Sequence, residues 1–457
     1  MGEPGMYGGG EKVKRVEVRE THGSRVFLAG ELGYKVKKPI RLDFFDYSTL
    51  ARRLAACREE VRVNRRLAED LYVGVRAIVA DEGGFRFAPE EAAGAVEYAV
   101  LMERFREQDT LAGLIEAGEL RGEDVDAVAR RLASFHREAA RVPATTRGRR
   151  GEGVCGSAAE LAHRWEANVE QLAGIGAPGE WHVDVARGFG ERFVGEHEEL
   201  IEARRRAGLV REGHGDLRCD HVLARPRVRV VDAIEFDVSL ARLDVAFDLA
   251  FLAMDLEAHG RRDAAERLLA AYGASGGELA GEPLESFYGA HWAMVRAKVA
   301  LLAGRREQAG ARWELGEALC WRARARAGAG GRADARDTRD AGARGRAGLP
   351  FSIVVCGPAG TGKSTLASEL AERSEAGVLA SDVLRRRMAG LGANERGGAE
   401  LYRSERVHEV YELLAREAGG RLERGESVIV DATCRARADR APILRALRDA
   451  GVGAGSL

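Results

Sequence analysis

Nine consecutive residues in the C-terminal part of the chain have the pattern of a phosphate-binding loop. The segment FSIVVCGPAGTGKST reads as a buried strand, a glycine-rich loop and the start of a helix, which is the context that the Walker A pattern requires. Its glycines let backbone N–H groups turn toward phosphate oxygens, and the following helix directs its positive end to the same place. We expect Lys363 to reach the β- and γ-phosphates of a nucleotide and Ser364 to hold Mg²⁺. The residues expected to bind nucleotide here are Gly357, Pro358, Ala359, Gly360, Thr361, Gly362, Lys363, Ser364 and Thr365.

Two aspartates follow later strands of the same region. Asp382 comes after the strand expected in GVLA, and Asp431 ends the strand expected in SVIVDAT. Carboxylates at the carboxyl ends of parallel strands lie on the rim where ligands bind. We therefore expect Asp431 to order Mg²⁺ and Asp382 to act in catalysis by orienting an acceptor hydroxyl group. A helix N-cap is the alternative role for either residue.

A second group of polar residues lies in the N-terminal half. Asp216, in HGDLRCDH, could accept a proton from the hydroxyl group of an acceptor. A carboxylate on the following strand, in VDAIEFD, could hold Mg²⁺ against the phosphates of ATP. The spacing from Asp216 to Asp232, Glu235 or Asp237 matches that between the catalytic and metal-binding aspartates of protein kinases.

A lysine and a glutamate upstream could complete this second site. Lys35 follows apolar residues on a strand, and Glu60 flanks the apolar stripe of the next helix, while Glu59 points nearly opposite that stripe. We expect a Lys35–Glu60 pair to orient the phosphates. Only seven of the 71 basic residues are lysine, and three of these lie in YKVKKP. In so arginine-rich a chain, a lysine hints that an ammonium group is required.

The elements that must position these residues can be read from apolar periodicity. Alternating apolar residues in KVKRVEV, SRVFLAG and GYKVKKP predict short antiparallel strands, and a helix is expected over about residues 48–71. A strand pair follows in AIVADEGGFRFAPE and AVEYAVLMERF, then helices over about 111–207. HGDL…VRVVDAIEF predicts a hairpin turning at Pro226, and helices resume over 248–325. Asp244 and Asp248 are expected to cap helices or brace the loop of Asp216, and His136 to pack at a helix end.

The two regions are separated by a stretch that cannot build a core. Residues 322–348 contain eight arginines against three aspartates and no aliphatic residue larger than alanine. This composition predicts a disordered linker. An arm that binds nucleic acid is the alternative, although no aromatic residues are interleaved with the arginines.

The C-terminal region resembles the P-loop small-molecule kinases related to gluconate kinase and the zeta-toxin group. The resemblance covers GPAGTGKST, SDVLRRRMAG, the helix over 402–426 and VIVDATCRARADR. It implies the strand order 2-3-1-4-5, in which this chain would lack the last two strands and an arginine-bearing lid. We therefore expect a C-terminally incomplete domain whose P-loop strand lies at the edge of the sheet, and which binds nucleotide with doubtful turnover.

Residues 11–325 resemble the aminoglycoside-phosphotransferase-like kinases, in the branch fused to a P-loop kinase domain. The resemblance lies in YKVKKP, CREEVRVNRRLAEDLY, LASFH, HGDLRCDHV, IEF…RLDVAFDLAFLAMDL and MVRAKV. It implies that Asp216 is the catalytic base, Lys35 the ATP lysine and Glu235 or Asp232 the metal ligand. The metal-binding asparagine of the family is His221 here, a poorer ligand because Mg²⁺ prefers oxygen, and Asp220 could substitute.

Composition limits the remaining possibilities. The formal net charge is −1, so no global field favours nucleic acid or an anionic membrane. No apolar run approaches the ~18 residues needed to span a bilayer, and the first residues do not read as a secretory signal. The six cysteines are scattered singly, so their spacing indicates neither a disulfide framework nor a zinc site. We expect a cytoplasmic protein without membrane or nucleic-acid partners, and its oligomeric state stays open.

The sequence thus predicts an α/β multidomain protein. Its parts are a bilobal protein-kinase-like α+β domain over 1–325, a flexible Arg/Gly/Ala linker over 326–349 and a partial P-loop NTPase domain with a parallel α/β sheet over 350–457. The predicted activity is ATP-dependent phosphoryl transfer to a small hydroxylated acceptor, with Mg²⁺ as cofactor. The alternative is a nucleotide-binding regulatory protein with little or no turnover. A regulator that binds nucleic acid through the basic linker is a third hypothesis.

Overall fold

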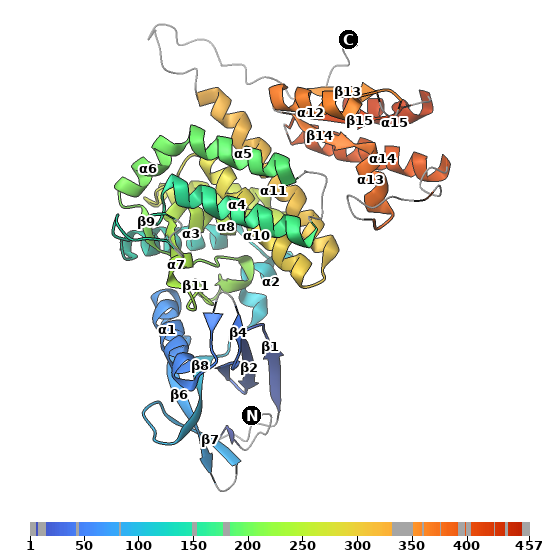
Figure 1. Cartoon of the computed structure of the whole chain (residues 1–457). Coiled ribbons are helices and arrows are strands. Elements are labelled where there is room, and N and C mark those ends of the chain that lie inside the picture. Colours follow the sequence, from blue (N-terminus) through green and yellow to red (C-terminus); the bar gives the residue numbers. More distant parts are fainter. Residues whose placement is uncertain are drawn as a thin grey trace. The chain divides into compact units, whose positions relative to one another are not determined.

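The computed structural model describes most of the chain, in two compact units (Figure 1). The first unit comprises Met1–His163 and His197–Leu279, and the second comprises Arg164–Glu196 and Ala280–Leu457. The described residues are 6–7, 15–42, 45–81, 84–148, 153–176, 183–330, 351–358, 361–374, 376–391, 398, 404–424, 426–434 and 437–449.

The first unit contains a six-stranded antiparallel sheet in the order β1-β2-β3-β8-β6-β7. The three strands expected near the N-terminus are confirmed, and they are joined by tight turns. Val26 of β2 pairs with Lys35 of β3, which in turn pairs with Val100 of β8. A two-stranded ribbon, β4–β5, lies beside the start of the helix that follows. The strands are β1 (Val16–Glu20), β2 (Ser24–Ala29), β3 (Leu32–Lys37), β4 (Arg41–Leu42), β5 (Phe45–Asp46), β6 (Tyr72–Asp81), β7 (Gly84–Pro89) and β8 (Ala95–Glu103).

Helix α1 (Leu50–Ala68) covers one face of this sheet (Figure 1). Thr49 caps its first turn by accepting a hydrogen bond from the Arg52 N–H, which satisfies one of the unpaired donors at a helix start. Cys57 and Val61 on its apolar stripe pack against sheet residues in a buried cluster that also includes Val231. This cluster ties the hairpin after Asp216 to the same helix that carries Glu60.

The remaining elements of the first unit are mostly helical. The expected hairpin at Pro226 is confirmed, since β10 and β11 pair antiparallel on either side of it. Asp244 caps α8 by accepting the Ala246 N–H, as expected. The elements are η2 (Glu107–Asp109), α2 (Leu111–Glu116), α3 (Gly122–Glu138), α6 (Glu198–Arg206), β9 (Val210–Glu212), η4 (Cys219–His221), β10 (Val222–Leu223), β11 (Arg229–Val230), α7 (Val238–Ala241), β12 (Arg242–Asp244), α8 (Val245–Ala258) and α9 (Arg262–Ala274).

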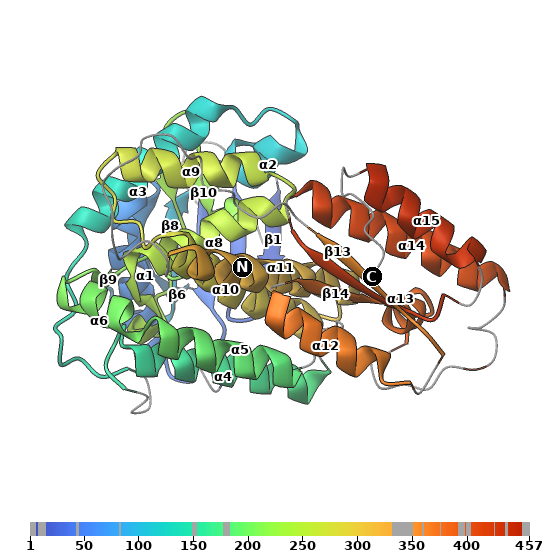
Figure 2. The same ribbon diagram turned by 90° about the horizontal axis from the view of Figure 1, so that it is seen from above.

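The second unit contains a parallel three-stranded sheet in the order β13-β15-β14. Within the described residues the P-loop strand β13 is therefore an edge strand, as the resemblance implied. Alternate residues of β15 point to opposite faces. Ile429 packs with Ala367 and Ala371 of α12, while Val428 and Val430 pack with α14 and α15, so helices cover both faces (Figure 2).

The helices of the second unit come from two separate stretches of sequence. Helices α4 and α5 precede Asp216 in the chain, yet they group with α10, α11 and the P-loop sheet. Trp165 of α4 stacks on Phe287 of α10, with ring centroids 4.7 Å apart. The elements are α4 (Ala158–Ile175), α5 (Val183–Glu196), α10 (Glu282–Leu302), α11 (Arg306–Gly330), β13 (Ser352–Cys356), α12 (Lys363–Ser374), β14 (Gly377–Ala380), α13 (Ser381–Met388), α14 (Ser404–Glu423), β15 (Val428–Ala432) and α15 (Arg437–Asp449).

Helix α11 extends into the stretch expected to be a linker. It ends at Gly330, a few residues beyond the helix end at residue 325 that the sequence suggested. The rest of the expected linker, residues 331–349, lies outside the described residues. The proposed domain boundaries stay a prediction. Among the described helices none is long and apolar enough to cross a membrane.

Candidate functional site

Two lysines on strand β3 share one buried glutamate. Lys35 and Lys37 are two residues apart, so both point to the same face of the sheet. The Lys35 Nζ lies 2.7 Å from Oε1 of Glu60, and the Lys37 Nζ lies 2.6 Å from Oε2. Glu60 is fully buried on α1, and the Lys37 side chain is also buried. The Lys35–Glu60 pair that the sequence led us to expect is therefore present, with a second lysine on the other carboxylate oxygen.

Each lysine also contacts one carboxylate from the segment after the hairpin. The Lys35 Nζ lies 2.6 Å from Oδ1 of Asp232, whereas Lys37 pairs with Glu235. The Tyr47 hydroxyl donates to the same Glu235 carboxylate over 3.1 Å. The Asp232 side chain is 46% exposed and the Glu235 side chain only 9%. Of the two candidate metal ligands, Asp232 is thus the one that faces solvent beside Lys35.

The backbone conformation of Asp232 explains why its carboxylate contacts Lys35 while that of Glu235 contacts Lys37. Asp232 has a φ of 63°, in the left-handed region that non-glycine residues rarely adopt. Its N–H donates to the Tyr72 hydroxyl over 3.2 Å, and the next N–H, of Ala233, donates to Oδ1 of Asn64 over 2.9 Å. These two hydrogen bonds stabilise a strained backbone conformation. Residues with such strain cluster at functional sites.

The charges of this group stabilise one another. Burial alone would lower the pKa of Lys35, but the carboxylates of Asp232 and Glu60 raise that pKa well above its ordinary value. Burial acts to raise the pKa of Asp232, yet the Lys35 ammonium, with His221, holds it far below the usual range. Burial likewise opposes ionisation of Glu60, whose pKa is nevertheless lowered by Lys35 and Lys37. Lys35, Asp232 and Glu60 are therefore ionised at neutral pH.

Asp216 lies on the loop between β9 and η4, next to a cation and an imidazole. Its carboxylate accepts a hydrogen bond from Nε of Arg218 over 3.1 Å. The His221 ring lies between two carboxylates: Nδ1 is 3.5 Å from Oδ2 of Asp216, and Nε2 is 3.6 Å from Oδ2 of Asp232. Asp220 is 57% exposed and pairs with Arg218 over 3.1 Å. The structure thus brings Asp216, His221 and Asp232 together, while Asp220 points to Arg218.

Helix α8 braces the loop that carries Asp216. Both oxygens of the buried Asp248 accept backbone hydrogen bonds, one from His214 over 2.7 Å and one from Gly215 over 3.0 Å. His136 contacts the same carboxylate through Nε2 at 3.2 Å, so it anchors Asp248 from α3. Gly215 has a φ of 83°, and a Cβ there would lie 3.0 Å from Ile234. A glycine is therefore required at this turn, and the bracing role expected for Asp248 is confirmed.

The P-loop region assembles a hydroxyl, a carboxylate and an ammonium. The Ser364 hydroxyl donates to Oδ2 of Asp431 over 2.6 Å, and the Lys363 ammonium donates to the carbonyl of Pro358 over 2.7 Å. Gly362 has a φ of 80°, which favours glycine at the turn into α12. The Thr361 hydroxyl also donates to the Pro358 carbonyl, over 2.8 Å. Ala359 and Gly360 lie outside the described residues, while Gly357 and Thr365 flank the loop.

Asp382 lies at the start of α13, just after the end of β14. It falls in the first turn of α13 with a side chain that is 66% exposed, and it pairs with Arg385 of the same helix. The N-cap position of α13 is held by Ala380, so Asp382 is not the N-cap residue that was its alternative role. Its assignment to catalysis stays a prediction.

Several residues of the first site were not identified from the sequence. Lys37, Tyr47, Asn64, Tyr72 and Arg218 all contact its charged members. A signal existed for Lys37, since lysines are rare in this chain and Lys37 is one of three in the run YKVKKP. No comparable signal marks Tyr47, Asn64 and Tyr72, because each contacts a residue that is distant in sequence. Arg218 is one of many arginines in the chain, so its residue type gave no signal either.

Both sites offer oxygen ligands that suit a hard cation such as Mg²⁺. In the first unit the half-exposed carboxylate of Asp232 faces solvent, although the nitrogen of His221 stands where a second oxygen would be preferred. In the second unit the Ser364 hydroxyl and the Asp431 carboxylate form the pair that P-loop proteins use for this ion. The donor sets therefore fit Mg²⁺, more completely at the P-loop.

Comparison with known proteins agrees with the P-loop geometry. The AAA domain family matches residues 353–454. This match and the loop geometry around Lys363 indicate a protein of the phosphotransferase or nucleotide-binding class.

Relatives that match almost the whole chain come from mycobacteria. The chain is 35% identical over 430 residues to the protein named "Uncharacterized protein Rv2004c" of Mycobacterium tuberculosis (strain ATCC 25618 / H37Rv), covering 92% of this chain and 78% of the relative. The same values hold for "Uncharacterized protein Mb2027c" of Mycobacterium bovis. The chain belongs to the family of these mycobacterial proteins.

Two solved structures with distant likeness are kinases by name. A choline/ethanolamine kinase family protein from Mesorhizobium loti is 18% identical, with a TM-score of 0.37, over 66% of this chain and 87% of its own. A choline kinase from Cryptosporidium parvum Iowa II is 11% identical, with a TM-score of 0.40, over 72% and 93%. At these scores the ion pairs described above, and not the likeness, define the site.

Proposed function

We propose that the protein is an ATP-dependent phosphotransferase whose reaction takes place in the first unit, at Asp216. The observation that carries this proposal is the linked group in which Lys35 contacts both Glu60 and Asp232, and His221 lies between Asp232 and Asp216. A cation held by a buried glutamate, a half-exposed carboxylate and a carboxylate on a braced loop are the parts that phosphoryl transfer requires.

In the proposed reaction Asp216 accepts the proton of an acceptor hydroxyl group. The acceptor oxygen forms a bond to the γ-phosphorus of ATP while the bond from that phosphorus to the β,γ-bridging oxygen breaks, and ADP leaves. Lys35 would bind phosphate oxygens, since Glu60 fixes its ammonium beneath them. Asp248 accepts hydrogen bonds from the backbone N–H groups of His214 and Gly215, which keeps the adjacent Asp216 in place for proton transfer.

Asp232 is the residue of this unit that would hold Mg²⁺, and Glu235, Asp220 and His221 are the weaker candidates. Glu235 is buried against Lys37 and Tyr47, and Asp220 is paired with Arg218. A bound Mg²⁺ ion would neutralise phosphate charge. In the free protein the Lys35 ammonium provides that positive charge beside Asp232.

The second unit is proposed to bind a nucleotide at its P-loop. Lys363 and the N-terminus of α12 supply the positive charge, and Ser364 and Asp431 would hold Mg²⁺. In the described part of the chain β13 is an edge strand. We assign binding to this site and leave its catalytic residue, proposed as Asp382, as a separate hypothesis.

Two contacts favour the alternative, a nucleotide-binding regulatory protein with little turnover. Arg218 donates to the carboxylate of Asp216, so one of the two oxygens that could accept the acceptor proton is already hydrogen-bonded. His221 presents nitrogen where the related kinases are expected to present an oxygen.

Measurements of nucleotide binding and of phosphoryl transfer distinguish the two proposed functions. Full-length protein should bind Mg·ATP at both units in calorimetry and should transfer phosphate with Asp216 intact. Asp216→Asn should abolish transfer and leave the number of bound nucleotides unchanged. The unaltered protein could instead bind nucleotide at both units but transfer phosphate to no hydroxylated acceptor and not to water. That result would support the regulatory alternative.

A further inference from the structure

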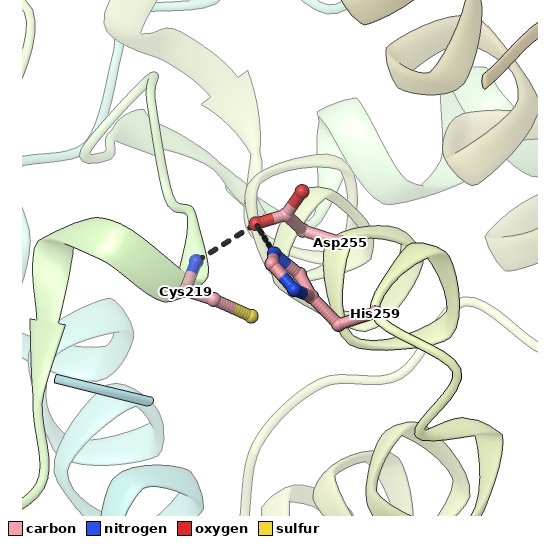
Figure 3. Close-up of side chains that lie close together, drawn as sticks. All are labelled: Cys219, Asp255 and His259. Carbon is pink, nitrogen blue, oxygen red and sulfur yellow. Dashed lines mark hydrogen bonds and ion pairs between the residues drawn. The ribbon is translucent and has the colours of Figure 1, made fainter. Parts of the chain in front are cut away.

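A second group of potential ligands lies close in sequence to Asp216, where the loop that carries it meets α8. Cys219 of η4, Asp255 of α8 and His259, which caps the end of α8, offer a sulfur, an oxygen and a nitrogen within 4.8 Å of one another. Figure 3 shows these side chains converging, with the Asp255 carboxylate between the backbone of Cys219 and the ring of His259. No role in the proposed phosphoryl transfer uses any of the three.

The group is built into the protein rather than spread over its surface. Cys219 and Asp255 are buried, and only His259 is partly exposed. The Asp255 carboxylate accepts a hydrogen bond from the Cys219 N–H over 2.9 Å, and its same oxygen lies 4.0 Å from Nε2 of His259. Two of the ligands are thus already placed by a backbone contact, and the third can approach from the solvent side.

The chemistry of this set selects the kind of ion. A thiolate, an imidazole and one carboxylate are ligands of Zn²⁺ and similar transition metals, whereas Mg²⁺ and Ca²⁺ prefer oxygen alone. The last carbonyl groups of α8 carry partial negative charge, which favours a cation at that helix end. Arg218 is the nearby opposing cation, but its guanidinium is bonded to Asp216 and Asp220.

We propose that Cys219, Asp255 and His259 form a three-ligand site for Zn²⁺ or a similar transition-metal ion. Cys219 releases its thiol proton to solvent when the ion binds, and a water molecule completes a tetrahedral shell. The bound ion would link the loop of Asp216 to α8, because the ligand Cys219 lies three residues after Asp216. The cysteine spacing gave no sign of it, because the partner ligands come from a helix and not from a second cysteine.

A purely structural role for these residues explains the same contacts without a metal. Asp255 would then be a structural acceptor for the Cys219 N–H, and His259 would form an (i, i+4) contact with it at the helix end. The alternative predicts that the protein binds no stoichiometric ion here. It also predicts that replacing Cys219 or His259 leaves metal content unaltered.

The test uses full-length protein, purified without a polyhistidine tag, incubated with Zn²⁺ or Co²⁺ and then freed of excess ion. Mass spectrometry should find about one zinc per chain, and the cobalt form should show a thiolate-to-cobalt charge-transfer band. Cys219→Ser should remove the band, and both Cys219→Ser and His259→Gln should lower zinc affinity tenfold or more. His259→Gln alters a partly exposed residue, so it keeps the test valid should Cys219→Ser fold poorly.

Matched controls are available elsewhere in the chain. Cys356→Ser and His408→Gln change exposed residues of the second unit and should leave zinc content and the cobalt band as in the unaltered protein. The proposal is overturned by zinc content well below one per chain at saturating ion. It is equally overturned by zinc binding that His259→Gln and Cys219→Ser leave unchanged. Neither result bears on phosphoryl transfer, which is measured separately.

Discussion

The Lys35 ammonium lies 2.6 Å from the carboxylate of Asp232, although 197 residues separate them in sequence. This contact joins the antiparallel sheet of the first unit to the segment that follows the β10–β11 hairpin. It places the only half-exposed carboxylate of the Lys35 and Lys37 ion pairs next to the lysine that we propose binds phosphate. The proposed function depends on this relationship, and the predictions below follow from the residues around it.

The two buried lysines should have separable roles. Lys37→Met leaves Glu60 and Glu235 buried with one cation fewer, so we expect a loss of about 3 kcal/mol in the free energy of unfolding of this unit. Lys35→Met should mainly weaken ATP binding, by about tenfold or more, because it removes a charge-assisted contact to phosphate. Chemical denaturation and calorimetry measure the two effects.

Lys38→Met is the matched control for both variants. Lys38 is adjacent in sequence but pairs at the surface with the exposed Glu20, so its loss should change neither stability nor ATP binding appreciably. Equal effects of Lys37→Met and Lys38→Met on unfolding would show that the buried pairing does not stabilise the unit.

The imidazole at position 221 should limit the use of Mg²⁺. His221→Asn supplies an amide oxygen beside Asp232, and Mg²⁺ prefers oxygen to nitrogen. We expect the Mg²⁺ concentration for half-maximal ATP binding or turnover in the first unit to fall several-fold. A titration with Mg²⁺ at fixed ATP measures it. A rise in that concentration would mean that the contacts of His221 with Asp216 and Arg218 matter more than the ligand type.

The P-loop lysine should control one of two nucleotide sites. Lys363→Ala should reduce the Mg·ATP bound per chain from two to one, since the ammonium is the main side-chain cation of that loop. Ser364→Ala should keep nucleotide binding but weaken its dependence on Mg²⁺. Arg424→Ala, which removes an exposed cation in the same unit, serves as the control. Unchanged stoichiometry in Lys363→Ala would refute the P-loop assignment.

Acid should destabilise the first unit through His214. Burial lowers the pKa of this side chain from 6.5 to about 4, so the folded protein keeps it neutral. Its Nε2 bonds to the Val231 carbonyl and its Nδ1 accepts the Asp216 N–H. Between these two pKa values the unfolded chain binds a proton that the folded chain does not. The contribution of neutral His214 to the free energy of unfolding is therefore fully present above pH 6.5. It falls as the pH drops, by roughly 3 kcal/mol near pH 4.

The measurement for this prediction is the free energy of unfolding from pH 4 to 7 in the unaltered protein and in His214→Asn. Burial acts to raise the pKa of Asp248, but His136 holds it below the value of the unfolded chain, so proton uptake by this carboxyl group in the unfolded chain adds to the loss at the acid end. The difference between the two proteins isolates His214. Identical pH slopes would contradict the neutral, buried state of this histidine.

The sequence predicted the secondary structure and the candidate residues of these sites better than it predicted which residues contact one another. The antiparallel strands and the hairpin at Pro226 follow from apolar alternation and turn residues, and the structure confirms them. The edge position of the P-loop strand among the described strands was implied by the family resemblance instead. Lys35 and Glu60 could be paired because helix and strand periodicity each assign a face.

Periodicity does not say which residues meet across long separations, and here the sequence fell short. It left Asp232 and Glu235 as equal candidates, because the left-handed conformation of Asp232 that directs it to Lys35 depends on Tyr72 and Asn64 from other elements. Lys37 and Glu235 pair across 198 residues. The grouping of α4 and α5 with α10 also depends on aromatic packing that has no local pattern.

The central claim, that Asp216 receives the acceptor proton, is tested most directly by phosphoryl transfer from γ-labelled ATP in a Lys363→Ala background, with a mixture of small hydroxylated compounds and water as acceptors. Silencing the P-loop leaves the first unit as the source of any transfer. We predict that label still reaches an acceptor or water in Lys363→Ala, and that adding Asp216→Asn removes it by a factor of at least about 100. Transfer that survives Asp216→Asn, or that already vanishes with Lys363→Ala, would contradict the account.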